Sequence, residues 1–439
     1  MDKFEAAGTW WLPNAPEKPV SGIMQFSPES GIKLRLLGAL MPDNARDLTV
    51  KHDIILGLTL ERGPVTLRGC ILSERPQKFS SDPSYSITHE TYTADLALTE
   101  ILTGEAKQLA FTGIDLRLTH LMNWAPESGF TWPGAQPKGR ARSMTVTYVP
   151  PTDKKAKFAG GTVTLGFSAH KQVEVMLSES IRQTASFRVT LDNPMPVDNI
   201  LTSIVFPLQN LVTLGTGIAN PVMELRVGLN DGTEDARSRS VLEPTEVRVL
   251  FQGARAAASV EKMLHPSQLL FTSRDLPHGF EDAIQQWFRV DRNFDSVCDL
   301  YCSYLYSADM YAEQQFLSMA QALESYHRCK SKRQMTLKSR LDSLVSTFEP
   351  VVNQLVLDRH KFAKSIVITR NYYTHYSQDK KSQAARGHAL FLLTRQLTIL
   401  MEACLMQELG FDVAGISALM GKNRYFKWLA AQRGGAPSS

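Results

Sequence analysis

The residue pattern changes near position 262, and this change limits the fold more than any other feature of the sequence. Before it, polar and apolar residues alternate, as at 32–36 and 144–149, and clusters of turn-forming residues separate the runs. Such alternation is typical of strands with one buried face. After position 262 glycine becomes scarce and apolar residues recur at helical spacing. We therefore expect an α+β multidomain protein, with a β-rich domain at 1–262 and an α-helical domain at 263–439.

The β-rich region is expected to form a mainly antiparallel domain, either a sandwich or barrel-like, with one helix near 197–212. The α-helical region is expected to form an all-α helical bundle. In its last long helix the apolar residues follow a period close to 3.6, and Gly410 follows them as a helix cap. The predicted helices of this region lie near 279–290, 294–328, 335–346, 350–376 and 384–409.

The composition of the chain indicates in which cellular compartment the protein is expected. Of the 439 residues, 43% are hydrophobic and 21% are charged, as in soluble globular proteins. No apolar run reaches the roughly 18 residues of a membrane span, and the start lacks an apolar leader, so we expect no membrane association and no secretion. The five cysteines are scattered, which favours the reducing cytoplasm over a disulfide framework.

A zinc site is the alternative that the cysteines raise. Cys298 and Cys302 are one helical turn apart, as in half of a zinc site. Neither a second pair nor a nearby histidine completes such a site in the sequence. We therefore expect buried thiols, no metal and no cofactor.

Positive charge is concentrated in one stretch of the chain. The net charge is only +4, yet residues 328–395 contain 14 basic and 4 acidic side chains. Such a field suits a polyanion, because phosphate contacts dominate affinity for nucleic acids. The alternative is a solvated basic helix face. The candidate RNA-binding residues in the predicted linker are Arg328, Lys330, Lys332, Arg333, Lys338 and Arg340.

A candidate catalytic motif lies in the same stretch. Residues 370–375 read Arg-Asn-Tyr-Tyr-Thr-His, so four residues separate Arg370 from His375. On a helix, Asn371 and His375 share a face and could hydrogen-bond, whereas Arg370 lies about 100° round the axis from Asn371. The buried stripe of this helix is expected to consist of Phe362, Ile366, Thr369, Tyr373 and Tyr376.

These residue types suit RNA cleavage without a metal. Histidine can take or deliver a proton near neutral pH, and a guanidinium can neutralise charge that grows on phosphate oxygens. Asn371 could orient the imidazole or contact the phosphate. The ribose 2′-hydroxyl would attack the neighbouring phosphorus, which leaves a 2′,3′-cyclic phosphate and a free 5′-hydroxyl.

The spacing alone is weak evidence, because short motifs also arise by chance. A second pair, Arg46 and His52, lies in the β-rich region beside Asp47, and we interpret it as fortuitous. The helical setting, Asn371 and the basic stretch favour the later motif, against a structural or solvated pair. His360 on the same predicted helix is expected to be exposed.

The motifs resemble a known family. The Arg370, Asn371 and His375 pattern, together with an earlier helix at 316–328, resembles the ApeA-like HEPN domain of bacterial antiphage proteins. The N-terminal region resembles the companion ApeA N-terminal domain, most specifically through Trp-Trp-Leu-Pro at 10–13. Only those three residues are carried over as catalytic. Outside the motif, we expect Glu324 to be a core or ion-paired residue and His327 to lie on the surface.

The resemblance implies a ribonuclease that aborts phage infection by cutting host or phage RNA. It also implies a homodimer that brings two motifs into one cleft through the HEPN domains. Such a cleft would resolve a conflict, because Arg370 and His375 lie about 140° apart on one ideal helix unless it breaks near Tyr373. The N-terminal domain would sense a phage protein or restrain the nuclease.

Two alternatives to the nuclease stay open. One is a non-catalytic HEPN module that binds nucleotides or partners. The other is a β-domain receptor for a phage component, with the helical region serving as a dimer scaffold.

Overall fold

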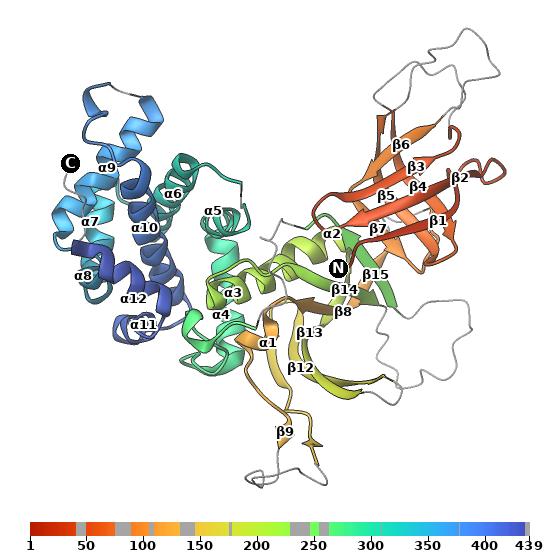
Figure 1. Cartoon of the computed structure of the whole chain (residues 1–439), viewed down its shortest axis with the longest axis horizontal. Helices are drawn as coiled ribbons and strands as arrows, with labels where there is room; N and C mark the ends of the chain where they lie inside the picture. Colours follow the sequence, from red (N-terminus) through yellow and green to blue (C-terminus); the bar gives the residue numbers. More distant parts are fainter. Residues whose placement is uncertain are drawn as a thin grey trace.

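The computed structural model has strands at one end and helices at the other (Figure 1). The last strand ends at Phe251, and helices longer than one turn resume at Gly279, so the predicted α+β architecture is confirmed. The structure describes residues 1–40, 50–74, 89–104, 109–131, 145–174, 178–228, 246–253, 263–307, 309–376 and 378–434.

Six antiparallel strands close into a barrel, one of the two forms predicted for the β domain. Closure occurs because β6 pairs with both β3 and β5. Trp10, Met24 and Tyr92 fill the interior and are fully buried. Gly57 is required beside Trp10, since a Cβ there would lie 2.2 Å from the indole ring. The strands are β1 (Phe4–Trp11), β2 (Val20–Ser27), β3 (Gly31–Leu36), β4 (Lys51–Thr59), β5 (Gly63–Glu74) and β6 (Glu90–Ala94).

The barrel sheet continues into a second set of antiparallel strands, because β5 also pairs with β7. The order onward is β7, β15, β14, β8, β13, β12 and β11. Alternation gives this extended sheet an apolar face, with Leu116 and Phe187 buried, and a polar face, with Asp115 and Arg117. The strands are β7 (Leu96–Thr99), β8 (Ala110–Leu118), β11 (Lys154–Phe158), β12 (Gly161–Glu174), β13 (Ser178–Pro196), β14 (Val222–Gly228) and β15 (Glu246–Phe251). Between β8 and β11 lie α1 (Leu121–Trp124) and a small pair, β9 (Phe130–Thr131) and β10 (Thr147–Tyr148).

Helices pack on the apolar face of the extended sheet. The helix predicted near 197–212 is observed as α2 (Val197–Ile200), a π-helical turn (Leu201–Val205) and α3 (Phe206–Thr216). Helix α4 (Gly279–Asn293) lies against β11, and the ring of Phe288 stacks on Phe158 at 4.6 Å. The indole of Trp287 donates to the carbonyl of Pro207 at 2.7 Å. The hydrophobic core therefore continues from the sheet into the helices.

The helical half contains more breaks than predicted. The helix predicted at 294–328 is interrupted between Tyr306 and Ala312, and the one at 350–376 ends at Leu355 and resumes at Arg359. Two further helices, α11 and α12, follow the last predicted one. The helices are α5 (Asp295–Tyr306), α6 (Ala312–Lys330), α7 (Leu337–Thr347), α8 (Glu349–Leu355), α9 (Arg359–His375), α10 (Gly387–Glu408), α11 (Val413–Met420) and α12 (Arg424–Ala431).

Two helical segments within the described residues are long and apolar enough to cross a membrane, 197–216 and 387–408. However, 67% and 72% of their apolar windows are buried inside the fold. They are therefore explained as core helices. The predicted cap of the second is observed, since Gly410 follows α10 at φ +91°.

Candidate active site

Helix α9 carries the predicted motif in its last two turns. Asp358 caps its start by accepting from the backbone N–H of Lys361 at 3.0 Å, and Tyr376 ends it in the left-handed conformation at φ +50°. Tyr376 does not belong to the buried stripe, contrary to the prediction, because the helix has ended there and the side chain is 64% exposed. The stripe residues that are buried as predicted are Phe362, Ile366, Thr369 and Tyr373.

Two partners hold the guanidinium of Arg370. Its Nη2 lies 3.7 Å from Oε2 of Glu324 on α6, and its Nη1 donates to Oδ1 of Asn371 at 3.3 Å. Glu324 is ion-paired, as expected, and also accepts from Arg328 at 2.7 Å. Two guanidinium groups therefore meet one carboxylate, which leaves net positive charge beside the motif. The sequence interpretation missed that Glu324 is the partner of Arg370.

His375 is the last residue of α9 and is exposed. The helix is continuous through Tyr373, so a break there does not resolve the geometric conflict, and Arg370 and His375 project about 140° apart. No hydrogen bond between Asn371 and His375 occurs in the described structure, where Oδ1 of Asn371 accepts from Arg370.

The segment after α9 is fastened to the motif helix. The hydroxyl of Tyr373 donates to the carbonyl of Ala385 at 3.2 Å, and the Ala385 N–H donates to Oγ1 of Thr369 at 3.0 Å. The next residue, Arg386, places its guanidinium 5.9 Å from the ring centre of Tyr372. These contacts place Arg386 beside the end of α9 that carries the motif. Its place in the basic stretch was the only sequence signal for it.

The predicted RNA-binding residues differ in their surroundings. Lys332 and Arg333 are exposed. Arg328 is 65% exposed although it pairs with a carboxylate. Lys330 and Lys338 are half exposed, and each pairs with a carboxylate, at 2.9 Å and 2.7 Å. All five can be reached from solvent, and only Arg328 is linked by a shared ion pair to Arg370.

Arg340 is buried, contrary to its predicted role at the surface, and only 4% of the residue is exposed. Its Nη1 lies 3.1 Å from Nδ1 of His327, and its Nη2 donates to the carbonyl of Arg333 at 3.2 Å. His327, predicted to lie on the surface, is also buried. Burial, and then the charge of Arg340, lowers the pKa of His327, which keeps the imidazole neutral and able to accept. We therefore remove Arg340 from the candidate RNA contacts.

The remaining residues considered in the sequence analysis are a histidine of α9, the second arginine–histidine pair and the two cysteines of the possible zinc site. His360 is exposed, as predicted, whereas Arg46 lies outside the described residues. Cys298 and Cys302 are buried thiols, as predicted, and burial raises the pKa of both. Within the stretches of chain that the structure describes, no group of three or more His, Cys, Asp or Glu side chains is placed to hold a metal.

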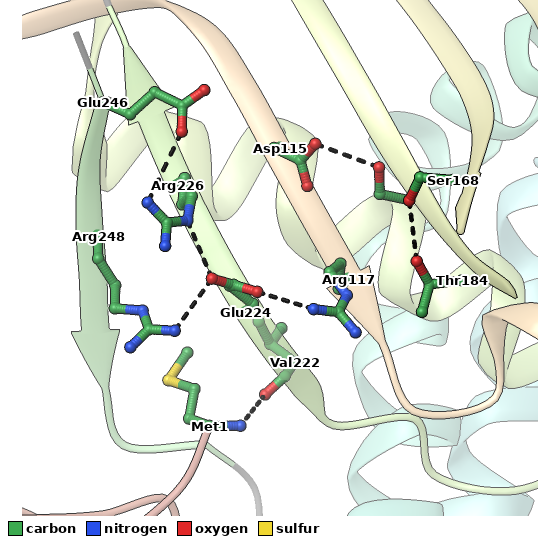
Figure 2. A network of polar contacts seen from close by, with 11 residues as sticks. Met1, Asp115, Arg117, Ser168, Thr184, Val222, Glu224, Arg226, Glu246 and Arg248 are labelled. Atoms are coloured by element: carbon green, nitrogen blue, oxygen red, sulfur yellow. Dashed lines mark hydrogen bonds and ion pairs between the residues drawn. The ribbon is translucent and has the colours of Figure 1, made fainter. Parts of the chain in front are cut away.

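A second candidate surface is the polar face of the extended sheet (Figure 2). Glu224 on β14 accepts hydrogen bonds from Arg226, Arg248 and Arg117 at 2.9, 3.0 and 3.0 Å. Burial acts to raise the pKa of Glu224, but the hydrogen bonds and charges of Arg226 and Arg248 outweigh it and hold this pKa at about 2. The cluster is thus a fixed arrangement of charges on the N-terminal half.

Two family models match the chain. ApeA N-terminal domain 1 matches residues 5–287, and Apea-like HEPN matches residues 317–414. The chain belongs to the ApeA family. HEPN domains are generally RNase or antiphage modules, and the second match contains both Glu324 and the whole of α9. The first match ends inside α4, so the boundary predicted at 262 stays a prediction. The curated proteins and the solved structures contain no match to the chain.

Proposed function

We propose that the chain is a metal-independent endoribonuclease of bacterial antiphage defence, which acts in the cytoplasm by abortive infection. The observation that supports this most is the placement of Arg370, held by Glu324 and Asn371, on the helix that ends at the exposed His375. The surrounding basic stretch supplies charge for binding RNA. Membership of a family of RNase or antiphage modules agrees with this assignment.

In the proposed reaction, the ribose 2′-oxygen forms a bond to phosphorus while the bond from phosphorus to the 5′-oxygen breaks. One base takes the 2′ proton, and one acid delivers a proton to the leaving 5′-oxygen. His375 is suited to either step. Arg370 neutralises charge on the non-bridging oxygens, and Asn371 contacts the guanidinium or the phosphate. The products are a 2′,3′-cyclic phosphate and a 5′-hydroxyl.

We further propose that the active form is a homodimer through the HEPN domain. Arg370 and His375 project about 140° apart on one continuous helix. The two side chains of one chain are therefore poorly placed to contact the same phosphate. Two chains would supply two histidines, one as base and one as acid. Light scattering of the full chain should give twice the mass of 49.0 kDa. A monomer at concentrations where RNA is cut would contradict the dimer.

The N-terminal half would then contain the sensing surface. The charged cluster around Glu224 is the candidate docking place for a phage protein, because fixed charges favour specific recognition. Loss of activation when charges of this cluster are reversed, with the barrel still folded, would support the assignment.

Cleavage of labelled RNA by the purified chain in the presence of EDTA tests the proposed reaction. We expect fragments with 5′-hydroxyl ends and 2′,3′-cyclic phosphates, and no cleavage by the Arg370→Ala and His375→Ala double variant. Full cleavage by the double variant, or fragments with 5′-phosphates, would rule the mechanism out. Retained phage protection by the His375→Ala chain would favour the non-catalytic binding module.

A further inference from the structure

A cavity of about 460 Å³ lies at the junction of the two halves of the chain. One wall comes from the end of α3 and the segment before α4, with Gly217 and Leu270, and the other from α10 and α12. Pockets for small ligands have volumes of about 300–1,000 Å³. Neither Arg370 nor His375 lines this cavity, so the proposed cleavage reaction does not explain it.

Arg395 on α10 brings a positive charge to the cavity without a matching carboxylate. Its guanidinium donates to the hydroxyl of Tyr304 and lies 5.5, 5.1 and 5.8 Å from the ring centres of Tyr304, Phe391 and Tyr425. Its Nε is buried without a hydrogen-bond partner, and no carboxylate of the described residues lies within 4.0 Å of the group. Partly desolvated cations are costly when unpaired, so this end of the cavity favours an anion.

Glu402 lines the cavity two turns further along α10, where its backbone is about 10 Å from the backbone of Arg395 by helix geometry. It is buried, and its Oε1 accepts from the hydroxyl of Tyr301 at 3.1 Å. Burial raises the pKa of Glu402 to about 8, although Tyr301 and Arg395 act to lower it. The carboxyl is therefore mainly protonated at neutral pH and does not neutralise Arg395. A protonated carboxyl offers one donor and one acceptor, which suits the edge of a nucleobase.

Apolar and aromatic side chains also line the cavity. Ile399 and Leu270 belong to the lining of the cavity. Tyr425 and Trp428 stack on each other at 5.5 Å and are 40% and 41% exposed, although both belong to the lining. Exposed aromatic faces at a cavity offer stacking surface to a planar ligand.

We propose that this cavity binds a nucleoside monophosphate, with the phosphate at Arg395 and the base toward Glu402, and that the ligand fastens the N-terminal half to the HEPN helices. Four features together support this class of ligand. They are the size of the cavity, the cation without a counter-charge, the protonated carboxyl and the aromatic walls. Binding does not depend on RNA cleavage. Any effect of the ligand on cleavage rests on the proposed ribonuclease function.

Calorimetry of the full chain with AMP and UMP tests the proposal, with adenosine and inorganic phosphate as partial ligands. At least one monophosphate should bind with one site per chain and raise the melting temperature. Adenosine and phosphate should each bind at least about tenfold more weakly, which corresponds to about 1.4 kcal/mol. Arg395→Gln and Trp428→Ala should each weaken binding by a similar factor, and the control Lys427→Gln, on an exposed residue of α12 outside the lining, should not.

Three results would overturn the proposal. The first is no saturable binding of either monophosphate. The second is inorganic phosphate binding as tightly as the monophosphates, which would indicate an anion site only. The third is unchanged binding in the Trp428→Ala chain, whose partly exposed side chain can be truncated without opening the core. Because binding is read by heat, each result is independent of whether the chain cuts RNA.

Discussion

Glu324 on α6 and Arg370 on α9 form an ion pair of 3.7 Å that joins two helices of the HEPN domain. Arg370 also donates to the adjacent Asn371, so its guanidinium is fixed from two sides. Asn371 comes from the same helix, whereas Glu324 is the contact that orients Arg370 from a second element. We therefore assign Glu324 as a positioning residue.

Glu324→Gln should lower kcat for RNA cleavage by about tenfold to a hundredfold, because a small misplacement of a catalytic group is costly. KM should change little, since Arg370 keeps its charge. Glu324→Asp should recover some of the lost activity. Asp342→Asn, which removes the partner of the exposed Lys338, is the matched control and should leave kcat unchanged. A Glu324→Gln enzyme with wild-type kcat would contradict the assignment.

The buried Arg340 predicts an effect on stability rather than on RNA. Arg340→Met removes the bonds to His327 and to the carbonyl of Arg333, and should lower the free energy of unfolding by about 1–3 kcal/mol. RNA affinity of the folded variant should stay at the wild-type value. Lys332→Ala on the exposed linker should do the opposite, with weaker RNA binding and a smaller salt dependence. Denaturant unfolding and salt-titrated RNA binding separate the two outcomes.

Glu224 predicts a pH dependence of the N-terminal half. Its pKa in the folded chain is about 2, below the ordinary value of 4.5, so its stabilisation is complete above pH 4.5 and is lost as the pH falls toward 2. Glu224→Gln should therefore lower the free energy of unfolding at pH 7, by at most about 3 kcal/mol. The difference from wild type should shrink between pH 5 and pH 3. Glu246→Gln, whose side chain is 57% exposed, should show little effect, and a Glu224 effect that does not change with pH would contradict the account.

Local patterns in the sequence predicted much of the fold. The order of strands before helices, the helix starting at 197 and the cap at Gly410 all depend on neighbours in the chain, and each is observed. Closure of the barrel between β5 and β6 depends on pairing between distant strands, which alternation alone does not specify. The break before α9 has a local signal in the sequence, because Asp358 is a typical N-cap residue.

The sequence predicted less of the site than of the fold, because contacts between distant residues are not specified by local patterns. The positions of Arg370, Asn371 and His375 on one helix follow from spacing, and the exposure of His375 follows from its place at the helix end. The pairing of Arg370 with Glu324 arises from packing between helices, and so does the burial of Arg340. A count of charges does not distinguish a basic residue at the surface from one that packs inside.

RNA from phage-infected cells tests the central claim most directly. Cells would contain the wild-type chain, His375→Ala, or the control His360→Ala, which alters an exposed histidine at the start of the same helix. We predict that fragments with 5′-hydroxyl ends accumulate on infection with the wild-type and His360→Ala chains, and that they are missing with His375→Ala. The same fragments at the same abundance in cells with His375→Ala would show that cleavage does not depend on this histidine.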